Sequence, residues 1–333
     1  MLNSKKYRFE IKNENYTMPE TKMSNITLLQ PLCFSPVELS DMQRIYDYTS
    51  KYGEGSCQHS PISMWSLAEK YGDEVCIEDD ILYVLRKNKC NDLFRVYLAP
   101  LGANVRKGFN RIMEDAKFYG KRVKFVTLTK GYADALSNFY SDEFKIDEDR
   151  DLAEYMYSTE RMASFSGRSL KKRRSEVNTF WNMYGEHATV KLIKPADHED
   201  ILKFENKWLK QNTHTHDMES LYREARMIKN QLEHFDDFGL SGIVLRIDGQ
   251  VYGFGYGVKL SDTHYDAIIE KGDREIPHIY KVLRQESVKQ CATDCAYVNM
   301  EEDIGIEGLR ALKMAYKPEY LLSKYIAVQK NEG

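Results

Sequence analysis

The stretch SGIVLRIDGQVYGFGYGVKL, residues 241–260, anchors the interpretation of the whole chain. Apolar residues alternate with other residues on both sides of an Asp-Gly dipeptide at 248–249. Asp-Gly supplies the two positive φ angles that a two-residue hairpin turn requires. The stretch therefore predicts a β-hairpin, and the neighbouring segments are assigned outward from it.

Segments on both sides of this hairpin show helical or strand periodicity. Two helices precede it, and a strand, a helix, a strand, a helix and a closing strand follow. These segments are 198–211, 218–235, 264–270, 277–291, 296–300, 306–316 and 320–328. The first half of the chain gives the same order, with helices at 37–51 and 61–71, a hairpin at 75–87, and then 92–100, 105–119, 123–129, 131–140 and 144–158. A repeated order of elements indicates duplication.

The repeated order predicts an α+β protein in which mixed sheets are flanked by helices. We expect an N-terminal arm at 1–27, a first domain at 28–160, a basic linking helix at 161–184 and a second domain at 185–333. The order is similar to that of the GNAT (N-acyltransferase) fold, and two copies in tandem resemble the GNAT-like aminoacyltransferases. The resemblance implies a tandem duplication of a GNAT-like fold, but a fold alone does not define a chemistry.

Length, composition and charge narrow the class of protein. A chain of 333 residues is long enough for two domains, and 42% hydrophobic residues argue against a disordered chain. The net charge of −3 means that any contact with nucleic acid must be made by a local patch. No apolar run approaches the roughly 18 residues of a membrane span, and the N-terminal residues lack the apolar region of a secretory signal. We therefore expect a cytoplasmic protein.

The cysteines and histidines give little support for a metal or redox site. The six cysteines lack CxxC spacing, and without an export signal we expect reduced, mostly buried thiols. His214 and His216 lie two apart in THTH, but no third ligand is evident near them in the sequence. We therefore expect no metal site.

A basic helix, SGRSLKKRRSEVNTF at 166–180, lies where the two halves meet. An apolar stripe runs along this helix, and Arg173 falls within the stripe. A buried guanidinium is costly without a partner, so Arg173 should meet a carboxylate, a carbonyl or a ligand anion. Two interpretations stay open: a solvated cationic face, or a site for the phosphates of RNA or a nucleotide. The anion-binding candidates are Arg168, Lys171, Lys172, Arg173 and Arg174.

A second charged stretch, EEDIGIEGLRALKMAYKP at 301–318, lies near the end of the chain. Asp303 occupies the expected N-cap position of a helix, and Pro318 cannot continue that helix. Arg310 and Lys313 lie three apart on one face of it. The stretch is either a well-capped helix or a wall of a site whose acids and cations bind both ends of a zwitterion.

This stretch, with 166–180 and AIIEKGD at 267–273, resembles the family related to the C-terminal domain of phosphatidylglycerol lysyltransferase. The pattern of that family, Gly-Leu-Arg, then Lys, then aromatic-x-Pro, is matched by Gly308, Leu309, Arg310, Lys313, Tyr316 and Pro318. The resemblance extends over most of the chain from about residue 28. It implies transfer of an aminoacyl group from an aminoacyl-tRNA to an amine or hydroxyl acceptor. The membrane helices of the full lysyltransferase have no counterpart here, so neither its lipid acceptor nor lysine is carried over.

Aminoacyl transfer needs an acid–base group and a cation for the developing oxyanion. We place Lys271 at the oxyanion and Glu270 or Asp303 at the amino group of the donor, which makes these three the predicted catalytic set. The basic helix would hold the acceptor stem of a tRNA, and the acceptor would be a small molecule or a lipid head group. The predicted substrate-binding residues are Arg310, Lys313, Tyr316, Glu302 and Asn299.

Two other functions stay open. An acyl-CoA-dependent N-acyltransferase needs a Q/R-x-x-G-x-G/A loop, whose backbone N–H groups approach a pyrophosphate at a helix start. Residues 99–109 and 270–280 occupy the two places for that loop and do not match it, so acetyl-CoA is the less favoured donor. A non-catalytic anion- or RNA-binding module is also compatible, since the chain carries no G-x-S-x-G or P-loop motif.

Overall fold

The computed structural model describes residues 30–87, 92–212 and 218–331. The predicted arm at 1–27 and the two histidines His214 and His216 lie outside the described residues. Both predicted hairpins are present, and their turns have positive φ at Asp79 and Asp80 in the first half and at 248–249 in the second. These are the backbone angles of a two-residue turn that follows the twist of its strands.

The first half begins with helices and continues as a sheet with two covering helices. The helices α1 (Met42–Tyr52), α2 (Pro61–Ser66) and α3 (Ala68–Tyr71) come first, and the helix expected at 61–71 is interrupted at Leu67. A short 3-10 turn spans Cys57–His59. The remaining elements are β1 (Ser35–Pro36), β2 (Glu74–Glu78), β3 (Ile81–Arg86), β4 (Phe94–Tyr97), α4 (Val105–Phe118), β5 (Arg122–Thr129), α5 (Lys130–Phe139) and β6 (Phe144–Ser158).

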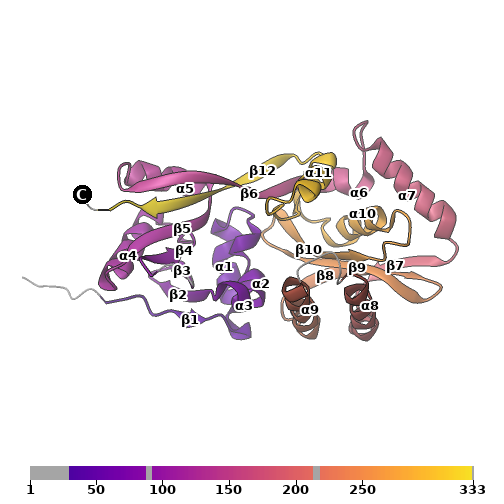
Figure 1. The fold of residues 1–333 in the computed structure, drawn as a ribbon, viewed down its shortest axis with the longest axis horizontal. Coiled ribbons are helices and arrows are strands. Elements are labelled where there is room, and N and C mark those ends of the chain that lie inside the picture. The colour runs from indigo at the N-terminus through magenta and orange to yellow at the C-terminus, as the bar shows by residue number, and fades with distance from the viewer. Residues whose placement is uncertain (1–29, 88–91, 213–217, 332–333) are drawn as a thin grey trace, which may run out of the picture.

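Two helices, α6 (Thr159–Ser164) and α7 (Lys171–Tyr184), and the strand β7 (Ala188–Leu192) link the halves. The second half repeats the predicted order with boundaries close to those expected. Its elements are α8 (His198–Asn212), α9 (Met218–Glu233), β8 (Leu240–Ile247), β9 (Gln250–Lys259), β10 (His264–Gly272), α10 (Ile279–Cys291), β11 (Tyr297–Asn299), α11 (Glu307–Ala315) and β12 (Tyr320–Gln329). In Figure 1, α8 and α9 lie on one side of its strands and α10 on the other.

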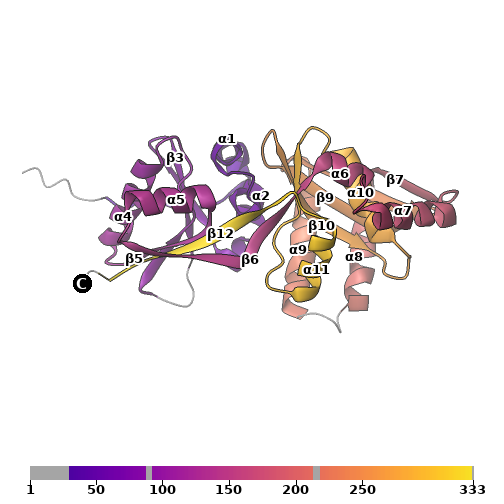
Figure 2. The ribbon, with the colours of Figure 1, turned by 90° about the horizontal axis from the view of Figure 1, so that it is seen from above.

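The strands of the described residues join one twelve-stranded sheet in the order β1-β2-β3-β4-β5-β12-β6-β11-β10-β9-β8-β7. The closing strand β12 therefore lies between β5 and β6 of the first half, antiparallel to both. The long strand β6 in turn pairs with β11 of the second half. Figures 1 and 2 show β6 and β12 running side by side from one half into the other. This pairing of β12 with the first half and of β6 with the second joins the two halves. The domain boundaries predicted from the sequence remain a proposal.

The two parallel strand pairs differ in a way that matters for the site. In the first half, all four residues of β4 pair with β5, from Phe94 to Tyr97. In the second half, β10 pairs with β11 only from His264 to Asp266, although β10 continues to Gly272. The pairing of β10 with β9 also shifts register between Asp266 and Ile269. Strand β11 is paired with β10 along all three of its residues and ends at Asn299, opposite Asp266. The chain after β11 continues to bond to Tyr155 of β6, so it separates from β10 immediately after Asp266.

Apolar side chains from both halves form the core. One cluster of buried residues includes Ile45 and Phe125 of the first half as well as Ile201 and Phe254 of the second. Burial of this apolar surface is the main term that holds the halves together. Among the described residues, no helix has the length and apolar character to cross a membrane.

Candidate functional site

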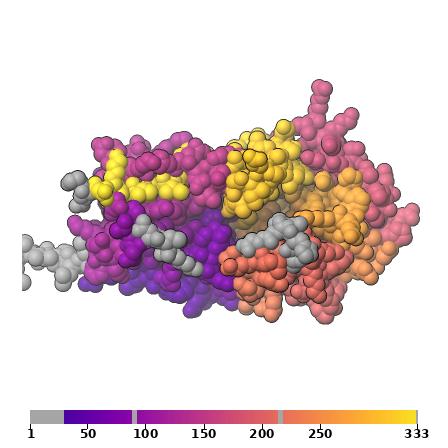
Figure 3. Space-filling view, in the orientation of Figure 1, coloured from indigo at the N-terminus to yellow at the C-terminus, as the bar shows by residue number. Residues whose placement is uncertain are grey.

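A cavity of about 300 Å³ lies between the halves beside the point where β10 and β11 separate. Side chains from α2 and α3 form one wall, and α9, β10 and the loop after β11 form the others. We call it the boundary cavity. The residues of its lining that carry the arguments below are Cys57, Gln58, Glu224, Glu301, Glu302 and Ile304. In the space-filling view, the C-terminal segment that contains α11 lies at the surface near the junction of the halves (Figure 3).

The loop that follows β11 carries a strained backbone. Glu301 and Ile304 have φ angles of 55° and 46°, in the left-handed region. A β-branched residue such as isoleucine rarely adopts this conformation, which costs on the order of 1–3 kcal/mol. Such strain persists only where surrounding contacts impose it.

Asp303 is the centre of the contacts that hold the loop. It is buried, and burial is compensated because four groups donate to its carboxylate. The donors are the Gly305 N–H, the Arg310 guanidinium with two bonds, the Tyr155 hydroxyl and Arg150. Hydrogen bonds from Arg310, followed by the one from Tyr155, hold the pKa of Asp303 well below its usual range. Asp303 therefore remains a carboxylate that fixes the loop.

The structure corrects the predicted N-cap. Helix α11 begins at Glu307 with Ile306 as its N-cap, so Asp303 lies three residues before that position. Arg310 bonds bidentately to Asp303 and also pairs with Asp151 at 2.7 Å. The Nε and Nη2 groups of this arginine are thus occupied by carboxylates of the protein.

Lys313 holds the same loop from its inner side. Its ammonium donates to the carbonyl oxygens of Met300 at 2.6 Å and Glu302 at 2.5 Å. Burial lowers the pKa of Lys313, against the attraction of Glu301 and Glu302. Arg310 and Lys313, predicted as substrate-binding residues, thus bind the loop that forms the cavity wall. Their direct contact with a substrate remains a prediction.

A fully buried ion pair lies behind the cavity. Lys324 of β12 and Glu154 of β6 are 2.6 Å apart, and neither side chain is exposed. Lys324 also donates to Ser56, and the Asn299 amide donates to Glu154 at 2.5 Å. Burial alone would raise the pKa of Glu154, but Lys324 and Asn299 outweigh that effect and lower it. Asn299 also donates to Gly55 and accepts the Glu301 N–H, so this predicted binding residue fixes the backbone around the cavity.

Next to this pair is a group of acids without such compensation. Asp266 is 0% exposed, and neither of its carboxylate oxygens has a hydrogen-bond partner among the described residues. One side-chain atom each of Cys57, Asp266 and Glu301 lies within 4.8 Å of the other two. We call these three residues the Cys57 cluster. Burial, reinforced by neighbouring carboxylates, raises the pKa of Asp266 and of Cys57 well above their ordinary values.

Glu301 and Glu302 connect this cluster to the cavity. Burial and the charge of Glu302 raise the pKa of Glu301 to about 8. Burial and the charge of Glu154 raise that of Glu302. The cavity therefore lies against a concentration of carboxyl groups that attracts cations and protons.

Lys271 is buried at the other side of the cavity. Its ammonium lies 2.6 Å from Glu205 and 2.5 Å from Glu224, with the Trp208 ring 4.1 Å away. Glu224 lines the cavity, so Lys271 reaches the cavity wall through this carboxylate. Burial raises the pKa of Glu205, against the attraction of Lys271.

Glu270 points to the opposite face of β10, as alternation along a strand requires. Arg284 of α10 binds it with two hydrogen bonds of 2.7 and 3.2 Å. Burial raises the pKa of Glu270, against Arg284. The buried ring of Tyr316 lies beneath Arg284 at 4.5 Å. The structure therefore does not bring Glu270, Lys271 and Asp303 together at one point, and their catalytic roles remain predictions.

The cations in and just before the basic helix α7 are of two kinds, those with partners in the protein and those that are exposed. Arg173 finds a carboxylate in Glu176 at 3.0 Å and lies 5.1 Å from the Tyr316 ring. Arg174 donates to the Phe165 carbonyl oxygen. The exposed cations are Arg168, Lys171 and Lys172. In Figures 1 and 2, α7 lies at the end of the second half that is remote from α2 and α3.

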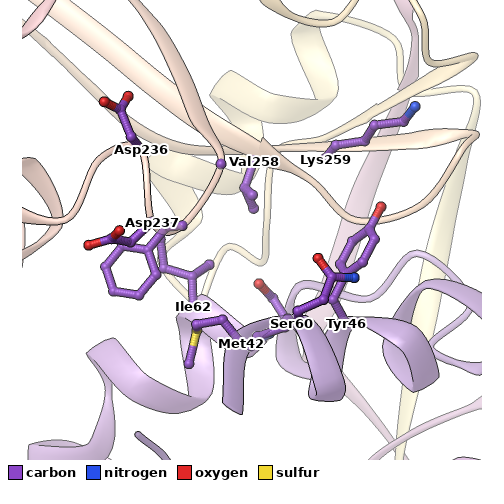
Figure 4. Close-up of a pocket in the computed structure, with 12 residues that line it drawn as sticks. Met42, Tyr46, Ser60, Ile62, Asp236, Asp237, Val258 and Lys259 are labelled. Carbon is purple, nitrogen blue, oxygen red and sulfur yellow. The ribbon is translucent and has the colours of Figure 1, made fainter. Parts of the chain in front are cut away.

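A second cavity of about 380 Å³ also lies between the halves, lined by α1, the turn after α9 and β9. Figure 4 shows Met42, Ile62 and Val258 among its walls, with Lys259 and the exposed Asp236 in the lining. Lys259 pairs with Asp262 at 3.4 Å. Because this lysine forms an ordinary surface ion pair, the second cavity is a weaker candidate for a functional site than the boundary cavity.

Sequence reasoning missed several residues of the site, namely Cys57, Glu154, Asp266, Glu224 and Lys324. Cys57 and Asp266 are separated by more than 200 positions in the sequence. Asp266 looked like an ordinary residue of a strand, because the separation of β10 from β11 has no local signature. A charged residue inside an otherwise apolar strand was the one signal that could have marked it.

Comparisons with known proteins place the chain among relatives of similar fold. A family model described as phosphatidylglycerol lysyltransferase, C-terminal, matches residues 49–328. A crystal structure of a conserved protein of unknown function from Bacteroides thetaiotaomicron is 26% identical, with a TM-score of 0.84, and covers 90% of this chain and 100% of that one. The structure of L-PGS from Bacillus licheniformis gives a TM-score of 0.60 at 14% identity, covering 87% of this chain and 92% of that one.

A curated relative is an uncharacterized protein of Mycoplasmoides gallisepticum, 25% identical over 172 residues. That match covers 52% of this chain and 54% of the relative, so the chain spans about half the length of the curated relative it matches. The shared architecture is a tandem GNAT-like α+β fold, as the order of elements predicted.

Proposed function

The chain belongs to the phosphatidylglycerol lysyltransferase C-terminal family, and from that premise we propose that it is an aminoacyltransferase that works in the boundary cavity. The donor is an aminoacyl-tRNA, and the acceptor carries an amine or a hydroxyl. One observation carries the proposal: a cavity of about 300 Å³, walled by carboxylates, opens where β10 and β11 separate. Its volume suits an amino acid rather than a large cofactor.

The reaction requires little more than positioning and charge. The acceptor lone pair attacks the carbonyl carbon of the ester that joins the amino acid to the tRNA ribose. The ester C–O bond then breaks, and the ribose oxygen leaves with the proton that the acceptor gives up. Holding both reactants in one cavity supplies much of the rate enhancement, since the encounter becomes effectively intramolecular.

Carboxylates of the cavity suit the ammonium group of the donor. Glu302 and Glu224 line the cavity from opposite elements, the loop after β11 and α9. We assign them to the α-ammonium group, because a carboxylate in a partly buried site pairs strongly with a cation. Lys271 then acts as a positioning residue that orients Glu224 through their 2.5 Å contact.

The tRNA itself requires contacts outside the cavity. Arg168, Lys171 and Lys172 are exposed near the start of α7 and free of the pairs that occupy Arg173 and Arg174. We assign these three cations to phosphates of the tRNA. Because α7 lies at the far end of the second half (Figure 2), it would contact a part of the tRNA remote from the aminoacyl end.

The test compares charged tRNA, uncharged tRNA and acetyl-CoA as ligands of the purified protein. Charged tRNA should bind more tightly than uncharged tRNA, and Glu302→Gln should abolish that preference because it removes the charge facing the ammonium group. Glu307→Gln is the matched control, since Glu307 is exposed in the first turn of α11 and does not line the cavity. Equal affinity for both tRNAs, or tight binding of acetyl-CoA alone, would overturn the proposal.

A further inference from the structure

The completely buried Asp266 is the starting point, because buried carboxyl groups normally accept several hydrogen bonds. Asp303, seven residues from Arg310, follows that rule with donors on both oxygens. Asp266 does not: both oxygens are buried and without a partner among the described residues. A buried acid kept without a protein partner is available to bind something else.

Two of the groups near Asp266 belong to residue types that can ligate a metal ion. The Cys57 thiol comes from the 3-10 turn of the first half, and the Glu301 carboxylate from the loop after β11. One donor atom of each lies within 4.8 Å of the other two. Ligand atoms around a tetrahedral zinc ion lie roughly 3.3–3.8 Å apart, given its bond lengths. Small side-chain rotations would therefore bring the three donors onto one ion.

The charges around the cluster leave room for a dication. Four carboxyl groups gather here, those of Glu154, Asp266, Glu301 and Glu302. The two ammonium groups beside them are already engaged, Lys324 with Glu154 and Lys313 with two backbone carbonyl oxygens. If all are ionised and Cys57 binds as a thiolate, five negative and two positive charges leave three negative charges uncompensated. A divalent cation would offset two of them.

We propose that Cys57, Asp266 and Glu301 bind a divalent transition-metal ion, with zinc as the ion that fits best. A thiolate ligand disfavours magnesium and calcium, which prefer oxygen ligands, whereas zinc takes sulfur and oxygen together. Cys57 and Glu301 also line the boundary cavity, so the fourth position of the ion would face it. Three protein ligands and one open position are typical of catalytic zinc.

The proposal concerns metal binding and stands independently of the transfer reaction. The experiment uses the full chain, treated with a chelator, dialysed, and titrated with zinc or cobalt. We expect one ion per chain by elemental analysis, and a cobalt spectrum with the near-ultraviolet band of a thiolate ligand. Asp266→Asn and Cys57→Ser should each weaken binding by about 100-fold or more, since even loss of an indirect support costs 10–100-fold.

Cys295→Ser is the matched control, because Cys295 is also a buried cysteine but lies outside the cluster. It should bind zinc as the unmodified chain does. Substoichiometric binding to the unmodified chain would overturn the proposal, as would a cobalt spectrum without the thiolate band. A folded Asp266→Asn variant with unchanged affinity would also overturn it. If that variant does not fold, the stoichiometry of the unmodified chain and the Cys57→Ser variant decide the question.

Discussion

Asp115 of the first half and Asp266 of the second half are both completely buried, but they have opposite surroundings. Asp115 of α4 accepts hydrogen bonds from the Leu32 N–H at 2.8 Å and the Tyr97 hydroxyl at 2.5 Å, and it pairs with Arg95 at 2.9 Å. Asp266 of β10 has no partner for either oxygen among the described residues. Both side chains are 0% exposed.

The difference follows from how far the strands of each parallel pair stay hydrogen-bonded to each other. Strands β4 and β5 stay paired along the whole of β4, and the neighbouring acid serves to fix that half. Strands β10 and β11 separate at Asp266, and a cavity opens beside the unpartnered acid. The two copies of a duplicated fold can thus differ: a buried acid stabilises one copy, and a buried acid lies beside the candidate site in the other. Burial of a charge alone does not distinguish the two cases.

The largest expected effect is that of Lys324→Met, which would leave the buried Glu154 with neutral hydrogen-bond donors but without its cation. Both members of this pair are 0% exposed. Breaking a buried pair by removing one partner costs about 3–5 kcal/mol. Urea denaturation should show this loss in the free energy of unfolding. A loss below about 1 kcal/mol would mean that Glu154 takes up a proton at little cost.

The next largest effect on stability is expected for Asp115→Asn. It leaves the Arg95 charge without its carboxylate, although Arg95 still lies 4.0 Å from the Tyr119 ring. We expect a loss of about 2–3 kcal/mol in unfolding free energy. Zinc stoichiometry per folded molecule should not change. A variant as stable as the original chain would remove the contrast between the two aspartates.

Asp266→Asn should act in the opposite direction. In the presence of a chelator, the variant should be more stable by about 1 kcal/mol, because an uncompensated buried acid is removed from a site. Added zinc should stabilise the original chain and leave the variant unchanged, as linkage requires. Thermal melting with and without zinc measures both effects. A destabilised variant would show that Asp266 has a structural partner after all.

The smallest effect on stability belongs to the exposed pair Lys171 and Lys172. Replacing both by alanine should change unfolding free energy by less than about 0.5 kcal/mol. If both contact phosphates, the slope of log affinity against log salt for tRNA should fall by roughly 1.4–1.8. Filter binding at several salt concentrations measures that slope. An unchanged slope would remove these lysines from the tRNA surface.

The features of the fold that depend on local sequence patterns were predictable. The Asp-Gly turn at 248–249, the period-two strands and the repeated order of elements depend on neighbouring residues, and all appear in the structure. The need of Arg173 for a partner was also predictable, since its position on the apolar stripe demands one. The insertion of β12 between β5 and β6 was not, because strand order depends on contacts between distant segments.

The candidate site was harder to predict for the same reason. The pattern from Gly308 to Pro318 pointed to a segment beside the boundary cavity, but it did not predict the contacts that its residues make. Arg310 and Lys313 bind the loop next to them, a fact that depends on the left-handed backbone at Glu301 and Ile304. The Cys57 cluster joins three segments that have no common spacing.

The most direct test of the account is the rate at which the Asp115→Asn and Glu302→Gln variants consume aminoacyl-tRNA in the presence of amine and hydroxyl acceptors. Asp115→Asn should keep the rate of the original chain per folded molecule. Glu302→Gln should fold and lose about 100-fold or more, equivalent to roughly 2.7 kcal/mol of transition-state stabilisation. A folded Glu302→Gln variant with full activity would contradict the central claim that the transfer takes place in the boundary cavity, which Glu302 lines.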